Sequence, residues 1–86
     1  MQTKHKKFEL QRDQADFLLK KYPNIKIVRH VFSQQHGLLF DLSVDDYIDF
    51  YEWLEDESIR TMKNDEPTDD TYMLESIFDS MYVQTN

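Results

Sequence analysis

The residues of this chain that could carry chemistry are mainly carboxylates, together with three histidines and one tryptophan. The absence of cysteine removes disulfides, thiolate zinc sites and a cysteine nucleophile. The single glycine, Gly37, leaves no glycine-rich phosphate loop, and no nucleophile elbow or HExxH spacing is present. The sequence therefore predicts a non-enzymatic protein without a cofactor.

Two arrangements resemble metal sites only superficially. His30 and His36 flank a predicted hairpin connection, but two histidines without cysteine or a metalloprotease spacing are weak ligand candidates. Residues 64–75 join two predicted helices, yet Asp69 stands where a calcium-binding EF-hand loop requires glycine, and Pro67 interrupts the ligand positions. We therefore predict no metal site.

Trp53 is the residue that most suggests a binding role. It lies on a predicted helix over 44–63, on the side opposite the helix's apolar stripe, and its helical neighbours are acidic apart from Phe50. Aromatic anchors within a polar surround are typical of interface hot spots. The predicted partner-binding residues are Asp49, Phe50, Glu52, Trp53, Asp56 and Glu57. The alternative is that a further helical layer covers Phe50 and Trp53.

The charge is divided unevenly along the chain. Residues 1–40 carry eight Lys/Arg and three acids, a formal charge of +5, whereas residues 41–86 carry two Lys/Arg and fourteen acids, a formal charge of −12. The segment 41–57 alone holds eight carboxylates. The charge predicts that an acidic helix docks onto a basic surface of a partner protein, in the manner of a nucleic-acid mimic such as a phage- or bacteria-encoded inhibitor. A solvated helix face that only maintains solubility is the alternative.

The basic first half suggests a different class of function, nucleic-acid binding. Its cationic residues are interleaved with aromatic ones and comprise Lys4, Lys6, Lys7, Arg12, Lys20, Lys21, Lys26 and Arg29. However, no nucleic-acid-binding fingerprint is present, and the sequence pI of about 4.7 is far from a basic footprint. Nucleic acid is therefore the less favoured partner.

Two amphipathic helices are predicted in the second half. Ser43 is an N-cap candidate for the helix over 44–63, with acids in the first turn that suit the helix dipole. The apolar stripe of this helix comprises Val44, Tyr47, Ile48, Tyr51, Leu54, Ile59 and Met62. After a polar break around Pro67, a helix over 70–82 buries Met73, Leu74, Ile77, Phe78 and Met81.

The first half predicts a helix and a β-hairpin. Residues 8–22 fit a helix that ends before Pro23, or a short strand over 7–10 followed by a helix over 14–22 with Asp13 as N-cap. The β-branched run 25–32 predicts a strand that pairs with 38–42, with Gly37 supplying a positive φ in the connection. The edge of this hairpin offers an alternative function as a homodimer, through Val28, Val31, Leu39 and Phe40.

The expected fold is one small α+β domain over 1–86. A small antiparallel hairpin, extended to three strands if 7–10 is a strand, packs against two or three helices in the order (β)α-ββ-α-α. Residues 1–7 and 83–86 are expected to fray. No apolar run approaches the ~18–20 residues of a membrane span and the first residues do not form a signal peptide, so a cytoplasmic location is expected.

Overall fold

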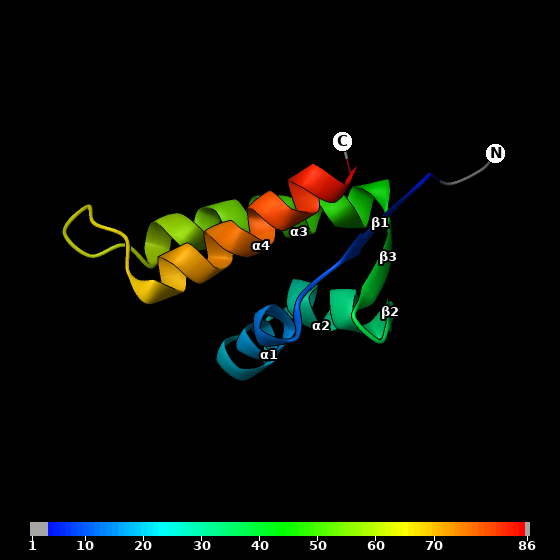
Figure 1. The fold of residues 1–86 in the computed structure, drawn as a ribbon, viewed down its shortest axis with the longest axis horizontal. Helices are drawn as coiled ribbons and strands as arrows, with labels where there is room; N and C mark the ends of the chain where they lie inside the picture. Colours follow the sequence, from blue (N-terminus) through cyan, green and yellow to red (C-terminus); the bar gives the residue numbers. More distant parts are fainter. Residues whose placement is uncertain (1–3, 86) are drawn as a thin grey trace.

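A computed structural model describes residues 4–85 and confirms the α+β class, with four helices and a three-stranded antiparallel sheet. The elements in chain order are β1 (His5–Glu9), α1 (Arg12–Lys21), α2 (Lys26–Ser33), β2 (Gln35–His36), β3 (Leu39–Ser43), α3 (Val44–Arg60) and α4 (Asp69–Thr85). In Figure 1, α3 and α4 form a long antiparallel pair, the sheet lies at one end of it, and α1 and α2 lie along one side.

The sheet has the strand order β1-β3-β2, so β3 is the central strand. Phe8 pairs with Phe40 in register, and their rings stack with centroids 5.3 Å apart. Alternation along β1 and β3 turns Phe8, Phe40 and Leu42 toward the helices, where all three are buried. The prediction of a short strand at 7–10 followed by a helix therefore has the right order of elements, although the strand spans His5–Glu9. The alternative of a single helix over 8–22 is wrong.

The segment 25–32, predicted as a strand, is helix α2 instead. In a strand, Arg29 would share a face with Ile27 and Val31, so no face would be wholly apolar. In the helix, Val28, Val31 and Phe32 form one buried face. Burial of a complete apolar face outweighs the β propensity of Val and Ile, which is a weak preference.

The second strand of the predicted hairpin, 38–42, corresponds to β3. Its partner in the hairpin is the two-residue strand β2, whose residues pair with Leu39 and Phe40. Gly37 connects β2 to β3 with φ of +66°, as predicted from its position between the two runs. This left-handed conformation costs other residues free energy because their Cβ collides with the backbone.

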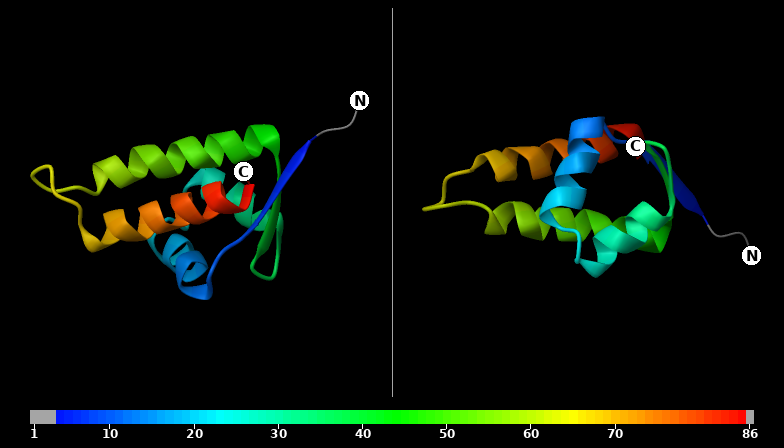
Figure 2. Two further views of the ribbon diagram at one scale, coloured as in Figure 1. Left: turned by 45° about the horizontal axis from the view of Figure 1, so that its top comes forward. Right: turned by 90° about the horizontal axis from the view of Figure 1, so that it is seen from below.

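Helix α1 begins earlier than predicted, and its N-cap is Gln11, not Asp13. The Gln14 side chain accepts a hydrogen bond from the Gln11 backbone N–H at 2.9 Å. Asp13 instead lies in the first turn, where its carboxylate accepts from the N–H of Gln14 at 3.0 Å. Helix α1 then crosses the α3–α4 pair, as the right-hand view of Figure 2 shows.

Polar side chains fix both ends of the α3–α4 hairpin. Ser43 caps α3 by accepting from the N–H of Asp46 at 3.2 Å, as predicted. Thr68 and Thr71 exchange side-chain and backbone hydrogen bonds of 3.0 and 3.3 Å at the start of α4, in the manner of a capping box. The helices span 44–60 and 69–85, whereas 44–63 and 70–82 were predicted.

The core lies between the α3–α4 pair, the inner face of the sheet and helices α1 and α2. The predicted stripe of α4 is largely right, since Leu74, Ile77 and Met81 are buried. The predicted stripe of α3 is partly wrong, because Ile48 and Ile59 are 45% and 62% exposed. Helix α3 packs on α4 along one side and on α2 along another, which rotates its buried face away from these isoleucines.

Both segments that were expected to fray, 1–7 and 83–86, include residues of regular secondary structure. Residues 5–7 belong to β1, and residues 83–85 complete α4. The Gln84 side chain pairs with both the N–H and the C=O of Glu9, at 2.6 and 2.7 Å, and so joins the two ends of the chain. The remaining residues of those predictions, 1–3 and 86, lie outside the described part.

Candidate protein-docking face

The structure divides the six predicted partner-binding residues among three environments. Asp49, Glu52 and Asp56 are exposed on the side of α3 that faces away from the core. Phe50 is fully buried at 0% exposure, so its assignment as an anchor is corrected. Trp53 and Glu57 are half-buried on a third side of the helix, toward the end of α1.

Trp53 is held between two other rings. Its indole lies nearly parallel to the Phe50 ring, at 8° and with centroids 6.1 Å apart. Tyr22, at the end of α1, stands edge-on to it at 88° with centroids 4.9 Å apart. The third helical layer considered above therefore covers Phe50 completely and Trp53 in part, so the indole acts mainly as packing between α1 and α3.

Glu57 lies close to Tyr22. Burial raises the pKa of the Tyr22 hydroxyl well above its ordinary value, and the neighbouring Glu57 carboxylate raises it further. Glu57 lies one helical turn after Trp53 on the same side of α3 and is half-buried, whereas the carboxylates of Asp49, Glu52 and Asp56 are exposed. It does not belong to the same surface as Asp49 and Asp56.

Two isoleucines that sequence reasoning placed in the core are instead the apolar residues of the exposed surface. Ile48 and Ile59 are eleven residues apart, about three helical turns, and so lie on one side of α3. They alternate there with exposed acids. We call this surface the outward face of α3, which comprises Asp45, Ile48, Asp49, Glu52, Glu55, Asp56 and Ile59. If the predicted apolar stripe of this helix had been restricted to positions near Tyr47 and Leu54, the sequence would have placed Ile48 and Ile59 on the surface.

Among residues 4–85, no cationic side chain forms an ion pair with a carboxylate of the outward face. The ion pairs formed within residues 4–85 are His5–Asp41 at 2.8 Å, Lys21–Asp70 at 3.6 Å and His30–Asp46 at 2.8 Å. None of them involves the five acids of the outward face. The two halves of the chain therefore share one core without cancelling the negative charge of this helix.

An aromatic strip borders the outward face where α3 meets α4. Tyr51 and Phe78 stack there with centroids 4.2 Å apart, and Tyr82 beside them is 55% exposed. Burial raises the pKa of Tyr51, and the neighbouring tyrosines and carboxylates, Glu55 among them, raise it further. This strip adds partly exposed apolar area next to the acids.

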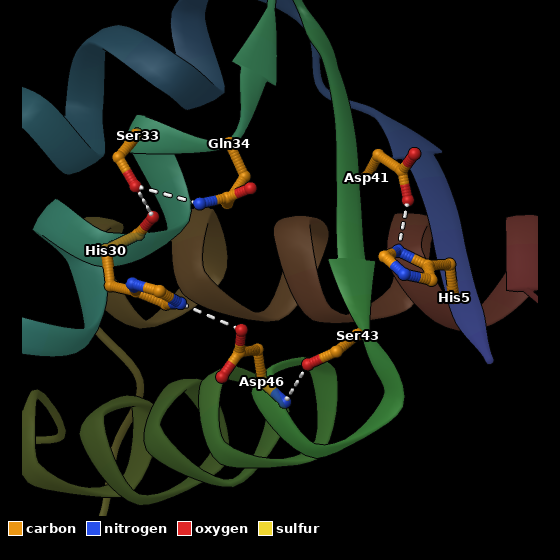
Figure 3. A network of polar contacts seen from close by, with 7 residues as sticks. All are labelled: His5, His30, Ser33, Gln34, Asp41, Ser43 and Asp46. Atoms are coloured by element: carbon orange, nitrogen blue, oxygen red, sulfur yellow. Dashed lines mark hydrogen bonds and ion pairs between the residues drawn. The ribbon is translucent and has the colours of Figure 1, made fainter. Parts of the chain in front are cut away.

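A histidine–aspartate pair positions the N-terminal end of α3. Figure 3 shows the His30 ring of α2 directed at Asp46, with Nε2 and Oδ2 2.8 Å apart, next to the Ser43 cap. The hydrogen bond from His30 is the main reason that the pKa of Asp46 is lowered, and the Ser43 hydroxyl lowers it further. The pair fixes α2 against the helix that carries the outward face.

The basic residues of the first half are spread over several elements. Lys4 precedes β1, and the others lie on β1, on both ends of α1 and on α2. Two of them are engaged internally. Lys6 donates to the Thr85 carbonyl at 3.3 Å, and Lys21 pairs with Asp70. No observation specifically favours nucleic-acid binding through these residues.

The predicted dimerisation edge is wrong. Val28 and Val31 are buried in helix α2, Phe40 is buried, and Leu39 lies in the central strand β3, which is paired with both β1 and β2. A hairpin edge made of these residues therefore does not exist. This correction concerns the proposed edge and not the oligomeric state.

Other classes of site receive no support from the described residues. Within 4–85, no group of three or more His, Cys, Asp or Glu side chains is placed to hold a metal ion. The turn at residues 63–66 is a tight reversal in which Asn64 and Asp65 have positive φ and Lys63 pairs with Glu66. None of the helices in this part combines the length and apolar composition that crossing a membrane demands.

Comparison of the chain with protein-family models, with curated proteins and with solved structures finds no match. The function must therefore be argued from the geometry of the surface itself.

Proposed function

We propose that this protein is a non-enzymatic binding module that docks the outward face of α3 onto a basic surface of a partner protein. One observation carries the proposal: a row of exposed carboxylates that form no ion pair within the described residues 4–85, with two exposed isoleucines, Ile48 and Ile59, within it. The isoleucines supply apolar anchors, and the acids supply a charged rim. Such a rim mainly accelerates the encounter with a cationic partner and selects against anionic ones.

The spacing of the acids supports a resemblance to a nucleic-acid strand. The five carboxylates of the outward face extend from Asp45 to Asp56, over an axial rise of about 16 Å, which corresponds to one charge per about 4 Å of helix. A DNA strand presents one phosphate per about 3.4 Å. The exposed isoleucines have no counterpart in a phosphate backbone. They favour a partner that also offers apolar contacts. Nucleic-acid mimicry is therefore a more specific version of the proposal, which needs its own test.

Affinity capture from the cells that encode this chain tests the proposal. We expect the full chain to retain basic proteins, and this retention to fall as salt is raised, because exposed charges are screened. The variant Asp49→Asn/Glu52→Gln/Asp56→Asn should lose these proteins, and Ile48→Ser/Ile59→Ser should weaken their retention at every salt concentration.

A matched control is Asp16→Asn/Asp65→Asn/Glu66→Gln, which removes the same number of charges from exposed positions outside α3. This control should retain the same proteins as the unmodified chain. Equal retention by the α3 variant and the control would overturn the proposal. If added duplex DNA displaces the retained protein, the surface acts as a nucleic-acid mimic; if it does not, the partner is recognised as a protein surface only.

A further inference from the structure

The aromatic strip along the seam between α3 and α4 comprises Tyr51, Phe78 and Tyr82. Tyr51 and Phe78 are half-buried and stack with centroids 4.2 Å apart, and Tyr82 is 55% exposed. Tyr47 continues the row, since its ring stacks on that of Tyr51 with centroids 5.8 Å apart. Rings that stay partly in solvent where two helices meet form an apolar surface that a partner can cover.

A small cavity adjoins the aromatic strip between the two helices. It has a volume of about 220 Å³, and its lining residues are Glu55 and Ser58 of α3 and Glu75, Phe78 and Asp79 of α4. The Phe78 ring therefore belongs both to the strip and to the wall of the cavity. Pockets for drug-sized molecules occupy about 300–1,000 Å³, so this cavity has the size for a single side chain.

The charges around the cavity specify a cationic occupant. Glu55, Glu75 and Asp79 line it, and none of them forms an ion pair within residues 4–85. Carboxylates of the two helices repel each other across the cavity, and a cation placed between them offsets this repulsion. An aromatic wall together with carboxylates complements a cation that can also pack on a ring, which is the geometry of a cation–π contact.

A metal ion does not fit this arrangement. In the part of the chain that the structure describes, no three His, Cys, Asp or Glu side chains are placed to hold a metal ion. The carboxylates of the cavity are therefore too widely spaced to meet at one ion. The arginine guanidinium is planar, directs several N–H donors outward and stacks on aromatic rings, so it can reach separate acceptors at once. The lysine ammonium concentrates its charge at one point and makes fewer of these contacts.

We propose that the cavity beside the aromatic strip receives an arginine side chain of the partner protein, whose guanidinium packs on the Phe78 ring and pairs with Glu55 and Asp79. This inference rests on the proposed function, because Glu55 also belongs to the outward face of α3. It specifies which cation of the partner's basic surface is selected. A guanidinium should bind more tightly than an ammonium by about threefold in Kd, the gain expected from a cation–π contact at a partly exposed site.

Titration of N-acetyl-arginine amide and N-acetyl-lysine amide into the isotope-labelled full chain, at equal ionic strength, tests this inference. We expect the arginine probe to shift the resonances of Tyr51, Glu55 and Phe78, with a Kd about threefold lower than that of the lysine probe. Phe78→Leu should abolish this preference, because it keeps an apolar side chain but removes the ring. Phe78→Tyr retains a ring and should preserve the preference, and Glu55→Gln/Asp79→Asn should weaken the binding of both probes.

Two variants provide matched controls. Phe17→Leu removes another half-buried phenylalanine ring, on α1, and Asp16→Asn/Asp65→Asn removes two exposed carboxylates that lie outside α3 and α4. Neither change should alter the Kd of either probe.

Equal affinity for the two probes, a preference for arginine that survives in Phe78→Leu, or resonance shifts confined to residues outside the strip and the cavity would overturn the inference. Equal affinity with shifts along the outward face of α3 would do so while leaving the proposed function intact. That function fails only if the α3 variant retains basic proteins as well as its own control does.

Discussion

At the scale of single residues, Ile48 and Phe50 show how two neighbouring apolar positions on α3 take opposite roles. Phe50 is 0% exposed and stacks against Trp53, whereas Ile48 is 45% exposed among acids. Only a side chain that leaves water on folding contributes fully to stability. Stability and binding should therefore separate cleanly at these two positions.

We expect Phe50→Ala to lower the free energy of unfolding by about 3–5 kcal/mol, because it removes a buried ring and leaves a cavity. Ile48→Ala should change it by no more than about 0.5 kcal/mol, since nearly half of Ile48 is exposed to solvent in the folded state. Urea unfolding followed by circular dichroism measures both values. Phe50→Leu, which costs about 1 kcal/mol, provides a folded reference if the alanine variant is too unstable. A larger loss for Ile48→Ala than for Phe50→Ala would contradict this assignment.

Trp53 provides an optical test of its packing, because it is the only tryptophan of the chain. Its half-buried indole should emit between the wavelengths of fully buried and fully solvated tryptophan. Removal of the Tyr22 ring, which stands 4.9 Å away, should shift the emission to the red and increase quenching by acrylamide. Tyr72→Ala removes an exposed tyrosine on α4 and serves as the control, with no expected shift. If Tyr22→Ala leaves the emission unchanged, the indole is not covered by α1.

At the scale of the elements, the start of α3 depends on Ser43 and on the pair of Asp46 with His30. Ser43→Ala should lower the free energy of unfolding by about 1 kcal/mol, the usual value for loss of an N-cap hydroxyl. Ser43→Asp preserves an acceptor for the N–H of Asp46 and should restore most of the loss. Chemical denaturation at neutral pH measures both changes. An unchanged stability in Ser43→Ala would show that the cap contributes nothing.

The lowered pKa of Asp46 gives this stabilisation a defined pH dependence. A carboxyl group with a lower pKa in the folded state stabilises that state fully above its ordinary pKa of 3.8. The contribution is lost as the pH falls through the lowered value. The difference in stability between the unmodified chain and Asp46→Asn should thus diminish as the pH falls below about pH 4. A difference that grows as the pH falls would contradict the sign of this linkage.

The turn between α3 and α4 is a second element-scale feature. Asn64 and Asp65 both have positive φ, at 52° and 63°, a conformation that asparagine and aspartate tolerate and β-branched residues do not. Asp65→Val should therefore cost about 1–2 kcal/mol, whereas Asp65→Gly should be neutral or slightly stabilising. Thermal unfolding of the two variants measures the difference. Equal melting temperatures would contradict the strain argument.

At the scale of the whole molecule, the negative charge is the dominant feature. The formal net charge is −7, and most of the excess lies on α3, the following turn and α4. Raising the ionic strength from about 0.1 M to about 1 M shortens the Debye length from about 10 Å to about 3 Å. We expect sodium chloride to raise the melting temperature, because it screens repulsion among these carboxylates.

The variant Asp49→Asn/Glu52→Gln/Asp56→Asn should respond less to salt, since it has fewer charges to screen. Melting curves of both proteins across a sodium chloride series provide the comparison. A melting temperature that falls with salt would mean that attractive ion pairs dominate the electrostatics of the fold.

The amino-acid sequence by itself determined the α+β class, the two long helices of the second half, the Ser43 cap, the positive φ of Gly37 and the excess of acid, because each follows from local chemistry or from composition. Only the tertiary structure decided the secondary structure of residues 25–32. Their propensities fit a strand, but only a helix places their apolar residues on one side and their polar residues on the other. It also decided which side of α3 is buried. Periodicity finds an apolar stripe, but the width and rotation of the buried face depend on how many neighbours pack against the helix, and those neighbours come from distant segments. For this reason Phe50, which the sequence placed on the binding surface, lies in the core, and Ile48 and Ile59, which the sequence placed in the core, lie on the surface.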